Sequence, residues 1–172
     1  METYTKSKYG EQATDWEGIK WVLKARGKEE SRYGFKYVNS NGKRIAATDG
    51  HRLHIFKPSQ KLPLGTYEVI ESKEKIIFNL IPDYNFTNWV GVIPKHRRDI
   101  RLQVRSNPKE DHVQAVAAIF RALPADRLLN LQYLSDCLNG DEYWKVNEDK
   151  DGNGPMMFRN GNKTAVIMPI KA

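Results

Sequence analysis

Apolar residues recur at helical spacing near the start of the chain. With about 100° between successive residues of a helix, Trp16, Ile19, Val22 and Leu23 gather on one face. This pattern predicts a helix over residues 15–26.

The neighbouring residues mark the ends of this helix. Thr14 and Glu17 have the spacing of a capping box, in which two side chains satisfy free backbone N–H groups at a helix start. Gly27 is typical of the position just after a helix. Trp21 lies among polar residues on the other face, and we expect it to pack against another element or chain.

β-Branched and aromatic residues predict strands in the segment that follows. Residues 33–38 and 44–57 indicate two strands, separated by Asn39-Ser40-Asn41-Gly42, a sequence that suits a tight hairpin turn. Residues 65–72 and 75–80 alternate between apolar and polar side chains and predict a second hairpin.

The pattern then changes. Residues 85–96 are irregular, and Pro94 is a connector between two halves of the protein. Alternation up to Arg105 predicts a strand that includes residues 100–105. The range 111–123 is ambiguous, because its alanines favour a helix whereas its apolar residues alternate as in a strand.

A second helix is predicted over residues 131–139. Asn130 is a suitable cap, and Leu131, Leu134 and Leu138 form an apolar stripe that Gly140 ends. The chain finishes with three predicted strands, the last two joined by a turn at Asn160-Gly161-Asn162. These strands cover residues 143–146, 156–159 and 164–169.

Length and composition limit the class of protein. The 172 residues suit one compact domain or two very small ones. The single cysteine, Cys137, excludes an internal disulfide and fits a reducing compartment. Because no apolar run is long enough to cross a bilayer and the N-terminal residues lack a signal-peptide pattern, we expect no membrane association and a cytoplasmic location.

The chain is basic, with a net charge of +7 and a pI near 9.4. Such a charge favours approach to a polyanion such as nucleic acid, although a basic surface that is merely solvated gives the same composition. The basic residues form two clusters along the sequence. The clusters are Lys20, Lys24, Arg26 and Lys28, and Lys95, His96, Arg97, Arg98, Arg101 and Arg105.

One seven-residue run, Ala47-Thr48-Asp49-Gly50-His51-Arg52-Leu53, closely resembles a signature of the bacterial β sliding clamp family, the processivity subunit of DNA polymerase III. Further segments resemble the same family in the same order. They are Ile81-Pro82-Asp83-Tyr84, Val92-Ile93-Pro94-Lys95, Asn107-Pro108, Asn130-Leu131-Gln132-Tyr133-Leu134 and Val166-Ile167-Met168-Pro169-Ile170-Lys171.

The resemblance implies an α+β, DNA-clamp-like fold, with two helix-plus-strands units and helices on one side of a curved antiparallel sheet. Residues 1–95 and 96–172 would be two clamp-like halves, together one compact domain. The resemblance also favours a strand over 111–123. A family subunit carries three domains and is more than twice as long, so this chain resembles a contracted clamp, and ring formation is the property that the contraction puts in question.

The resemblance also implies a cleft that binds short peptide motifs of polymerases and other replication proteins. Leu53 and Pro94 would supply dry surface, Gly50 would allow close backbone approach, and Arg52 and Lys171 would hold polar groups of the peptide. The family commonly ends in Met-Pro-Met-Arg, so Ile170 and Lys171 imply a different peptide preference. The full predicted cleft is Arg32, Phe35, Thr48, Gly50, His51, Arg52, Leu53, Pro94, Met168, Pro169, Ile170 and Lys171.

Helices of the family also meet DNA phosphates without reading bases. Carried over to this chain, the first helix offers Lys20, Lys24 and Arg26 for double-stranded DNA.

The peptide cleft has a simpler alternative. Taken singly, apolar strand residues such as Leu53, Ile55, Val166 and Met168 are ordinary core positions, so the prediction of a cleft depends on the segments in combination.

No catalytic or metal-binding constellation is evident, and we expect no cofactor. His51 and His54 are three residues apart on one predicted strand and point to opposite faces. Residues 147–152 imitate the start of a calcium loop, but Phe158 occupies the position that requires glutamate. Cys137 lies on the apolar side of the second helix, as a buried structural thiol does.

We therefore predict a sliding-clamp-like accessory protein of DNA replication, not an enzyme, that binds clamp-binding motifs and is a monomer or small homo-oligomer. The first alternative is a peptide-binding module or decoy without DNA-encircling activity. The second is a DNA-modifying enzyme with an unrecognised site. A contracted clamp of this kind suits a bacteriophage or mobile element.

Overall fold

The structure, a computed structural model, divides the chain into two compact units, residues 1–88 (unit 1) and 89–172 (unit 2). It describes residues 2–10, 13–29, 33–95, 97–104, 116–117, 119–121, 128–138, 144–149 and 154–170, with the backbone alone for 97–104.

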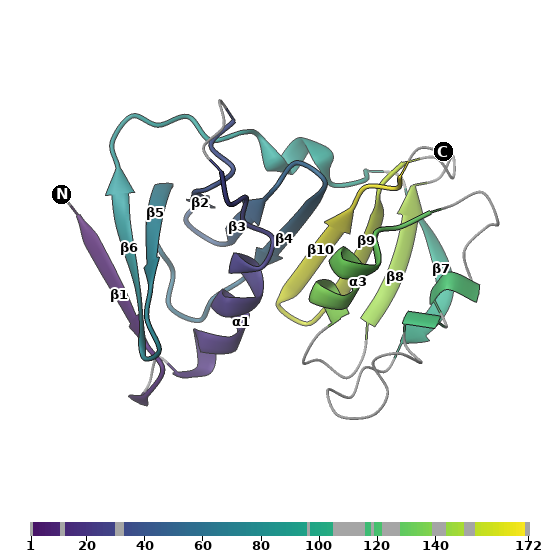
Figure 1. The fold of residues 1–172 in the computed structure, drawn as a ribbon, viewed down its shortest axis with the longest axis horizontal. Coiled ribbons are helices and arrows are strands. Elements are labelled where there is room, and N and C mark those ends of the chain that lie inside the picture. Colours follow the sequence, from purple (N-terminus) through teal and green to yellow (C-terminus); the bar gives the residue numbers. More distant parts are fainter. Residues whose placement is uncertain are drawn as a thin grey trace. The chain divides into compact units, whose positions relative to one another are not determined.

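In its described residues, unit 1 packs the helix α1 on an antiparallel sheet, as predicted for an α+β fold (Figure 1). Its strands follow one another in space in the order β1-β6-β5-β2-β3-β4. The helix α1 contacts β1, β3 and β4. The elements are β1 (Thr3–Ser7), α1 (Ala13–Leu23), β2 (Val38–Ser40), β3 (Ile45–Thr48), β4 (Arg52–Phe56), β5 (Gly65–Glu71) and β6 (Lys75–Ile81).

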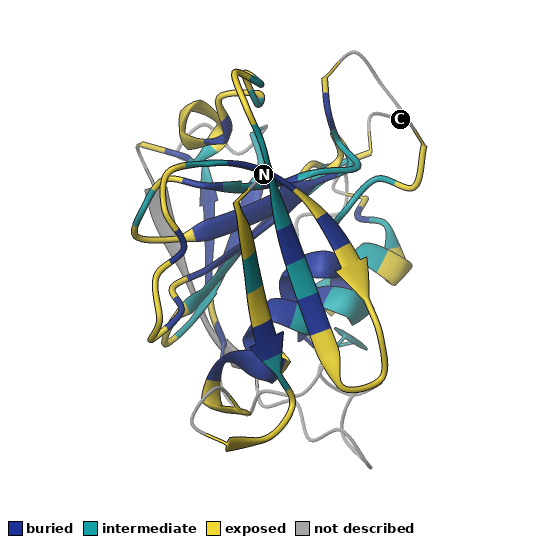
Figure 2. Ribbon diagram, turned by 90° about the vertical axis from the view of Figure 1, so that its left-hand side faces the viewer, coloured by how far each residue is buried: buried dark blue, intermediate teal, exposed yellow. Residues whose placement is uncertain are grey.

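The core of unit 1 lies between α1 and the sheet. Ile19 and Val22 of α1 are buried, as are Ile55 of β4 and Phe78 of β6. Buried and exposed residues alternate in β5 from Tyr67 to Ile70, and in β6 the buried Ile76 and Phe78 alternate with less buried neighbours. Figure 2 shows this banding. Trp21 is buried and stacks on the His54 ring at 4.2 Å, so the prediction that it packs on another element is confirmed.

The helix is displaced from its predicted range. It begins at Ala13, which places Thr14 inside the helix, so the prediction that Thr14 caps it is wrong. It ends at Leu23, where the amides of Ala25 and Arg26 bond to the carbonyls three residues earlier. The Gly27 amide then bonds to the Phe35 and Thr48 carbonyls, at 2.9 and 3.3 Å. Bonding to the rest of the unit thus ends the helix earlier than its apolar pattern indicates.

Two of the predicted strands are also wrong in extent. Residues 33–37 form turns, with the Tyr37 amide bonded to the Gly34 carbonyl, and only Val38–Ser40 is a strand. The single strand predicted over 44–57 is a hairpin, because β3 and β4 pair antiparallel from Ile45↔Phe56 to Thr48↔Leu53.

The remaining hairpins of unit 1 are as predicted. β5 and β6 pair over six positions from Thr66↔Ile81 to Glu71↔Ile76. The Asn41-Gly42 turn joins β2 to β3, with Gly42 at φ 79°. β1, which pairs with β6 far along the chain, was not predicted from the sequence.

Unit 2 is a second helix-and-sheet arrangement. Its strands follow the order β10-β9-β8-β7, all antiparallel, and α3 contacts β10. A register shift interrupts β7 between Ile100 and Gln103. The elements are η2 (Trp89–Val92), β7 (Arg97–Val104), α3 (Leu131–Leu138), β8 (Trp144–Asp149), β9 (Met156–Asn160) and β10 (Lys163–Ile167).

The second predicted helix and its cap are confirmed. The Asn130 Oδ1 accepts bonds from the amides of Gln132 and Tyr133, at 2.9 and 3.2 Å. Leu134 and Leu138 are buried, but Leu131 is 61% exposed and does not belong to the buried stripe. Gly140 lies outside the described residues.

The strand predicted over 111–123 is wrong where the structure describes it. Residues 116–117 and 119–121 are helical, with Ile119 buried. The high helix propensity of alanine therefore prevails over the alternation there. The other residues of this range lie outside the described part of the chain.

Candidate functional site

The signature run forms the tip of the β3–β4 hairpin. Asp49 holds this turn, because its Oδ1 accepts the amides of His51 and Arg52, each at 3.0 Å. The Thr48 hydroxyl donates to the Arg52 carbonyl at 2.6 Å and accepts the Gly50 amide at 3.0 Å. Gly50 has φ 92°, which L side chains rarely adopt, so glycine is the suitable residue at this turn.

Arg52 links the hairpin to the end of α1. Its Nε donates to the Asp49 Oδ2 at 3.0 Å, and its Nη2 donates to the Lys24 carbonyl at 2.6 Å. The Arg52 and Asp49 side chains are only 10% and 18% exposed. A charged hydrogen bond in such a partly buried place is stronger than a surface ion pair, so Arg52 has a structural role in unit 1.

Phe35 lies beside the same turn. A Cβ on Gly50 would fall 2.9 Å from the Phe35 Cε2, and the Phe35 ring stacks on Tyr33 at 5.4 Å between centroids. Phe35, Thr48, Gly50 and Arg52 are thus brought together in unit 1. His51 is exposed. Leu53 is only 2% exposed and belongs to the core of the unit, as expected from its interpretation as an ordinary core residue.

The C-terminal segment of the predicted cleft belongs to unit 2. Val166 and Ile167 are buried in β10, after which Met168 and Ile170 are 42% and 49% exposed. The strand predicted to continue to Pro169 ends at Ile167. The Ile170 amide donates to the Leu128 carbonyl at 2.8 Å, which holds the segment beside the residues that lead into α3.

Met168 and Ile170 lie in a unit whose surface carries further apolar side chains. Leu128 is 48% exposed and Leu131 is 61% exposed.

The other residues of the predicted cleft differ in what the structure says of them. Pro94 is buried. Arg32 and Lys171 lie outside the described residues, and the cleft that combines segments of both units stays a prediction.

Two of the three basic residues predicted to meet DNA, Lys20 and Arg26, are engaged with one carboxylate. The Glu71 side chain accepts Lys20 Nζ at 2.8 Å and Arg26 Nη2 at 3.0 Å. The Arg26 Nη1 also donates to the Val69 carbonyl at 3.0 Å. These contacts reduce the positive potential that Lys20 and Arg26 offer to a phosphate backbone.

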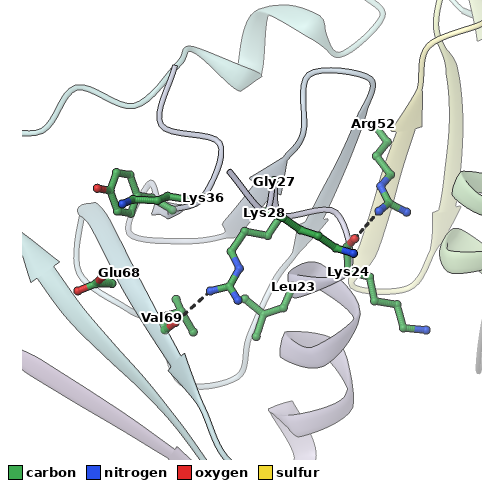
Figure 3. Close-up of a pocket in the computed structure, with 10 residues that line it drawn as sticks. Leu23, Lys24, Gly27, Lys28, Lys36, Arg52, Glu68 and Val69 are labelled. Carbon is green, nitrogen blue, oxygen red and sulfur yellow. Dashed lines mark hydrogen bonds between the residues drawn. The ribbon is translucent and has the colours of Figure 1, made fainter. Parts of the chain in front are cut away.

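A pocket of about 500 Å³ lies in unit 1 beyond the C-terminal end of α1. Lys36 and Glu68 are on one side of it, and Lys24 and Arg52 on the other, with Leu23 and Val69 between them (Figure 3). The sequence pointed to the basic cluster near α1. It did not point to Lys36 and Glu68, because no pattern in the sequence around 36–37 or 68–69 indicates that these segments meet the end of α1.

A metal-binding cluster and a membrane-spanning helix are both absent from the described residues. That part of the chain contains no group of three or more histidine, cysteine or acidic residues that could hold a metal ion. None of its helices is long and apolar enough to cross a membrane.

The fold resembles that of sliding clamps. Superposition with the DNA polymerase sliding clamp of Pseudomonas aeruginosa gives a TM-score of 0.60 at 17% identity, over 99% of this chain and 67% of the clamp. The Helicobacter pylori β clamp bound to a DNA ligase peptide gives 0.62 at 12% identity, over 98% of this chain and 66% of the clamp.

A third clamp agrees with these two. The DNA polymerase III β chain of Streptococcus pneumoniae gives a TM-score of 0.63 at 12% identity, over the whole of this chain and 65% of that protein. This chain therefore has a clamp-like fold and spans about two thirds of the length of these clamps. No protein-family model and no curated protein sequence matches it.

Proposed function

We propose that this protein is a clamp-like accessory protein of DNA replication that binds clamp-binding peptides of replication proteins and catalyses no reaction. The observation that carries the proposal is the signature hairpin, locked by Asp49 and Arg52, in a chain with a clamp-like fold. The Helicobacter pylori β clamp with the similar fold binds a DNA ligase peptide. We further propose that residues 1–95 and 96–172 are two clamp-like halves of a cytoplasmic protein.

The exposed C-terminal residues provide the direct test of peptide binding. Met168→Ala and Ile170→Ala remove apolar surface that solvent already reaches, so the fold should tolerate both changes. Truncation of a binding anchor typically costs about 1–4 kcal/mol, so each variant should bind a clamp-binding peptide about tenfold or more weakly. Fluorescence anisotropy with a labelled peptide measures this affinity.

Leu64→Ala is the matched control, because Leu64 is 75% exposed and lies in unit 1 outside the predicted cleft. It should bind the peptide as the unmodified protein does. If Met168→Ala and Ile170→Ala also bind normally, the C-terminal segment is not part of a peptide site and the proposal fails.

A peptide-binding module or decoy without DNA-encircling activity is the second candidate. The ion pairs of Glu71 with Lys20 and Arg26 favour it, because they occupy two of the three residues proposed to meet DNA. If the protein binds double-stranded DNA through α1, affinity should fall steeply with salt and fall further in the double variant Lys20→Glu, Lys24→Glu. If the affinity for DNA does not change with salt concentration, or is kept in the double variant, the DNA contact lies on another surface.

A further inference from the structure

The sulfur-containing side chains of unit 2 differ sharply in their access to solvent. Met156 and Met157 of β9 are 0% and 1% exposed, and the thiol of Cys137 in α3 is 0% exposed. Met168, in contrast, is 42% exposed and follows β10, which ends at Ile167. Among the described residues, Met168 is therefore the sulfur-containing side chain that a dissolved oxidant reaches without any opening of the fold.

Access to solvent decides which thioether a peroxide oxidises. The sulfur attacks one peroxide oxygen and the O–O bond breaks, so that hydrogen peroxide yields a sulfoxide and a molecule of water. The electron pair that leaves the sulfur reduces the peroxide, and no other reactant is needed. The buried sulfur atoms of Met156 and Met157 meet the peroxide only after the structure around them opens. We therefore expect Met168 to be oxidised first.

Met168 belongs to a segment that presents apolar side chains to solvent. Ile170 is 49% exposed, and its amide donates to the Leu128 carbonyl at 2.8 Å in an antiparallel bridge. Residues two apart share a face where the chain is extended, so Met168 and Ile170 form one apolar surface. A sulfoxide on Met168 therefore places a polar S–O group on the surface that the proposed function assigns to a peptide.

Oxidation changes what this surface can bind. A thioether is a flexible, apolar group that adapts to the apolar side chains of a partner. The sulfoxide is polar and chiral, and its oxygen requires a hydrogen-bond donor when a ligand covers it. An apolar anchor of a peptide supplies no such donor. The oxidised side chain therefore opposes the contact that the thioether favours.

We propose that Met168 is a modification site, at which a peroxide converts the thioether to a sulfoxide and thereby weakens binding of the peptide. The inference rests on the proposed function, because it concerns regulation of the same peptide site. The change is confined to one atom, the Met168 Sδ, and is reversible, since reductases return methionine sulfoxide to methionine.

Peptide mapping by mass spectrometry, after brief treatment of the full chain with hydrogen peroxide, tests the selectivity. Met168 should gain an oxygen at a rate about tenfold or more above the rates of Met156 and Met157, because the buried pair must wait for the structure to open. Circular dichroism checks that the treated protein is folded. Equal rates at the three methionines of the folded protein would overturn the proposal.

Fluorescence anisotropy with a labelled clamp-binding peptide, free of methionine, cysteine and tryptophan, tests the consequence. Protein oxidised at Met168 should bind this peptide about tenfold or more weakly than untreated protein. Methionine sulfoxide reductases for both sulfoxide epimers should then restore the affinity. If they remove the oxygen from Met168 while the affinity stays low, another lesion causes the loss and the proposal is overturned.

Two variants separate the effect of the sulfur from that of the position. Met168→Leu keeps an apolar side chain of similar volume without sulfur, so it should bind the peptide equally well before and after peroxide. Met168→Gln places a polar group on an unbranched side chain and should bind as weakly as the oxidised protein without any treatment. If peroxide weakens binding to Met168→Leu as much as to the unmodified protein, Met168 is not the responsive residue.

Failure of this inference can be told from failure of the proposed function. If the untreated protein does not bind the peptide, the proposed function fails and the regulatory role of Met168 falls with it. If the untreated protein binds the peptide and the protein oxidised at Met168 binds it equally tightly, the peptide site stands and the role of oxidation alone is overturned.

Discussion

Asp49 is the residue on which the shape of the signature hairpin depends most directly. It accepts two backbone amides of its own turn and the Arg52 Nε, and these bonds fix the path between β3 and β4. A side chain that accepts turn amides in this way replaces hydrogen bonds that the backbone alone cannot make.

We expect Asp49→Ala to lower the free energy of unfolding by about 1–3 kcal/mol, because it leaves partly buried donors unsatisfied. Asp49→Asn is the matched control, since its amide oxygen still accepts the backbone bonds while the negative charge opposite Arg52 is lost. It should destabilise less than alanine does. Urea unfolding measures both changes, and equal losses in the two variants would show that the ion pair, not the turn, carries the energy.

Gly18 is a second residue whose size matters. A Cβ placed on it would fall 2.3 Å from the Phe56 Cζ, so α1 and β4 approach each other more closely than another residue allows. Gly18→Ala should gain about 1 kcal/mol of helix propensity but lose about 1–3 kcal/mol through overpacking, for a net loss of stability.

Glu17→Ala tests this balance on the same helix, because Glu17 is exposed and alanine there meets no neighbour of this kind. Its free energy of unfolding should change by about 0.5 kcal/mol or less. A Gly18→Ala protein that is more stable than the unmodified one would show that Phe56 moves aside without cost.

At the scale of elements, local pattern predicts best where an element makes its contacts close by in the chain. The β5–β6 hairpin and the Asn130 cap of α3 have this property, and both were predicted. β1 was not, because its partner β6 is about seventy residues away and its own sequence is mostly polar. The early end of α1 depends on carbonyls of Phe35 and Thr48, which no pattern within the helix reveals.

For the candidate site too, the sequence indicated some of the features and missed others. The resemblance pointed to the signature run as part of the cleft, although the run was predicted to lie within one strand and not at a hairpin tip. The structure brings Phe35, another predicted cleft residue, beside it. Short-range spacing did not indicate that Arg52 reaches the carbonyl of Lys24, nor that Lys20 and Arg26 share Glu71. Such bonds follow from how α1, β4 and β5 pack, which depends on residues distant in sequence.

Tyr67 makes the stability of the β1–β6–β5 part of the sheet depend on pH. Burial, with smaller contributions from Tyr4 and Glu2, raises the pKa of Tyr67 from 10.0 to about 12. The folded state thus holds the phenol proton more tightly than the unfolded chain does. Its contribution to stability is complete below pH 10 and is lost as the pH rises from 10 through 12.

Unfolding of the unmodified protein and Tyr67→Phe from pH 8 to pH 11 tests this prediction. The variant loses the hydrogen bond to the Pro63 carbonyl at every pH, so a constant difference is expected below pH 10. Above pH 10 the unmodified protein should lose stability faster than the variant. The lowered pKa of the buried Lys6 acts in both proteins and cancels in the comparison. A difference that stays constant to pH 11 would contradict the prediction.

At the scale of the whole molecule, the chain spans about two thirds of the length of the clamps that it resembles. Among the described residues, α1 and α3 are the α-helices of eight residues or more, and two such helices per chain are few for a ring around DNA. We therefore expect a monomer or small homo-oligomer, with a mass that sedimentation equilibrium measures with and without primed circular DNA. A ring-sized assembly that stays on circular DNA and slides off linear DNA would contradict this expectation.

The buried thiol of Cys137 has a practical consequence. It is the single cysteine of the chain, it is 0% exposed, and it lies in α3, which contacts β10. A thiol reagent reaches a buried thiol only when the structure around it opens, so the rate of alkylation under native conditions reports opening of the surroundings of α3. The protein therefore carries, without any engineered label, a chemical reporter of local opening in the unit that contains Met168 and Ile170.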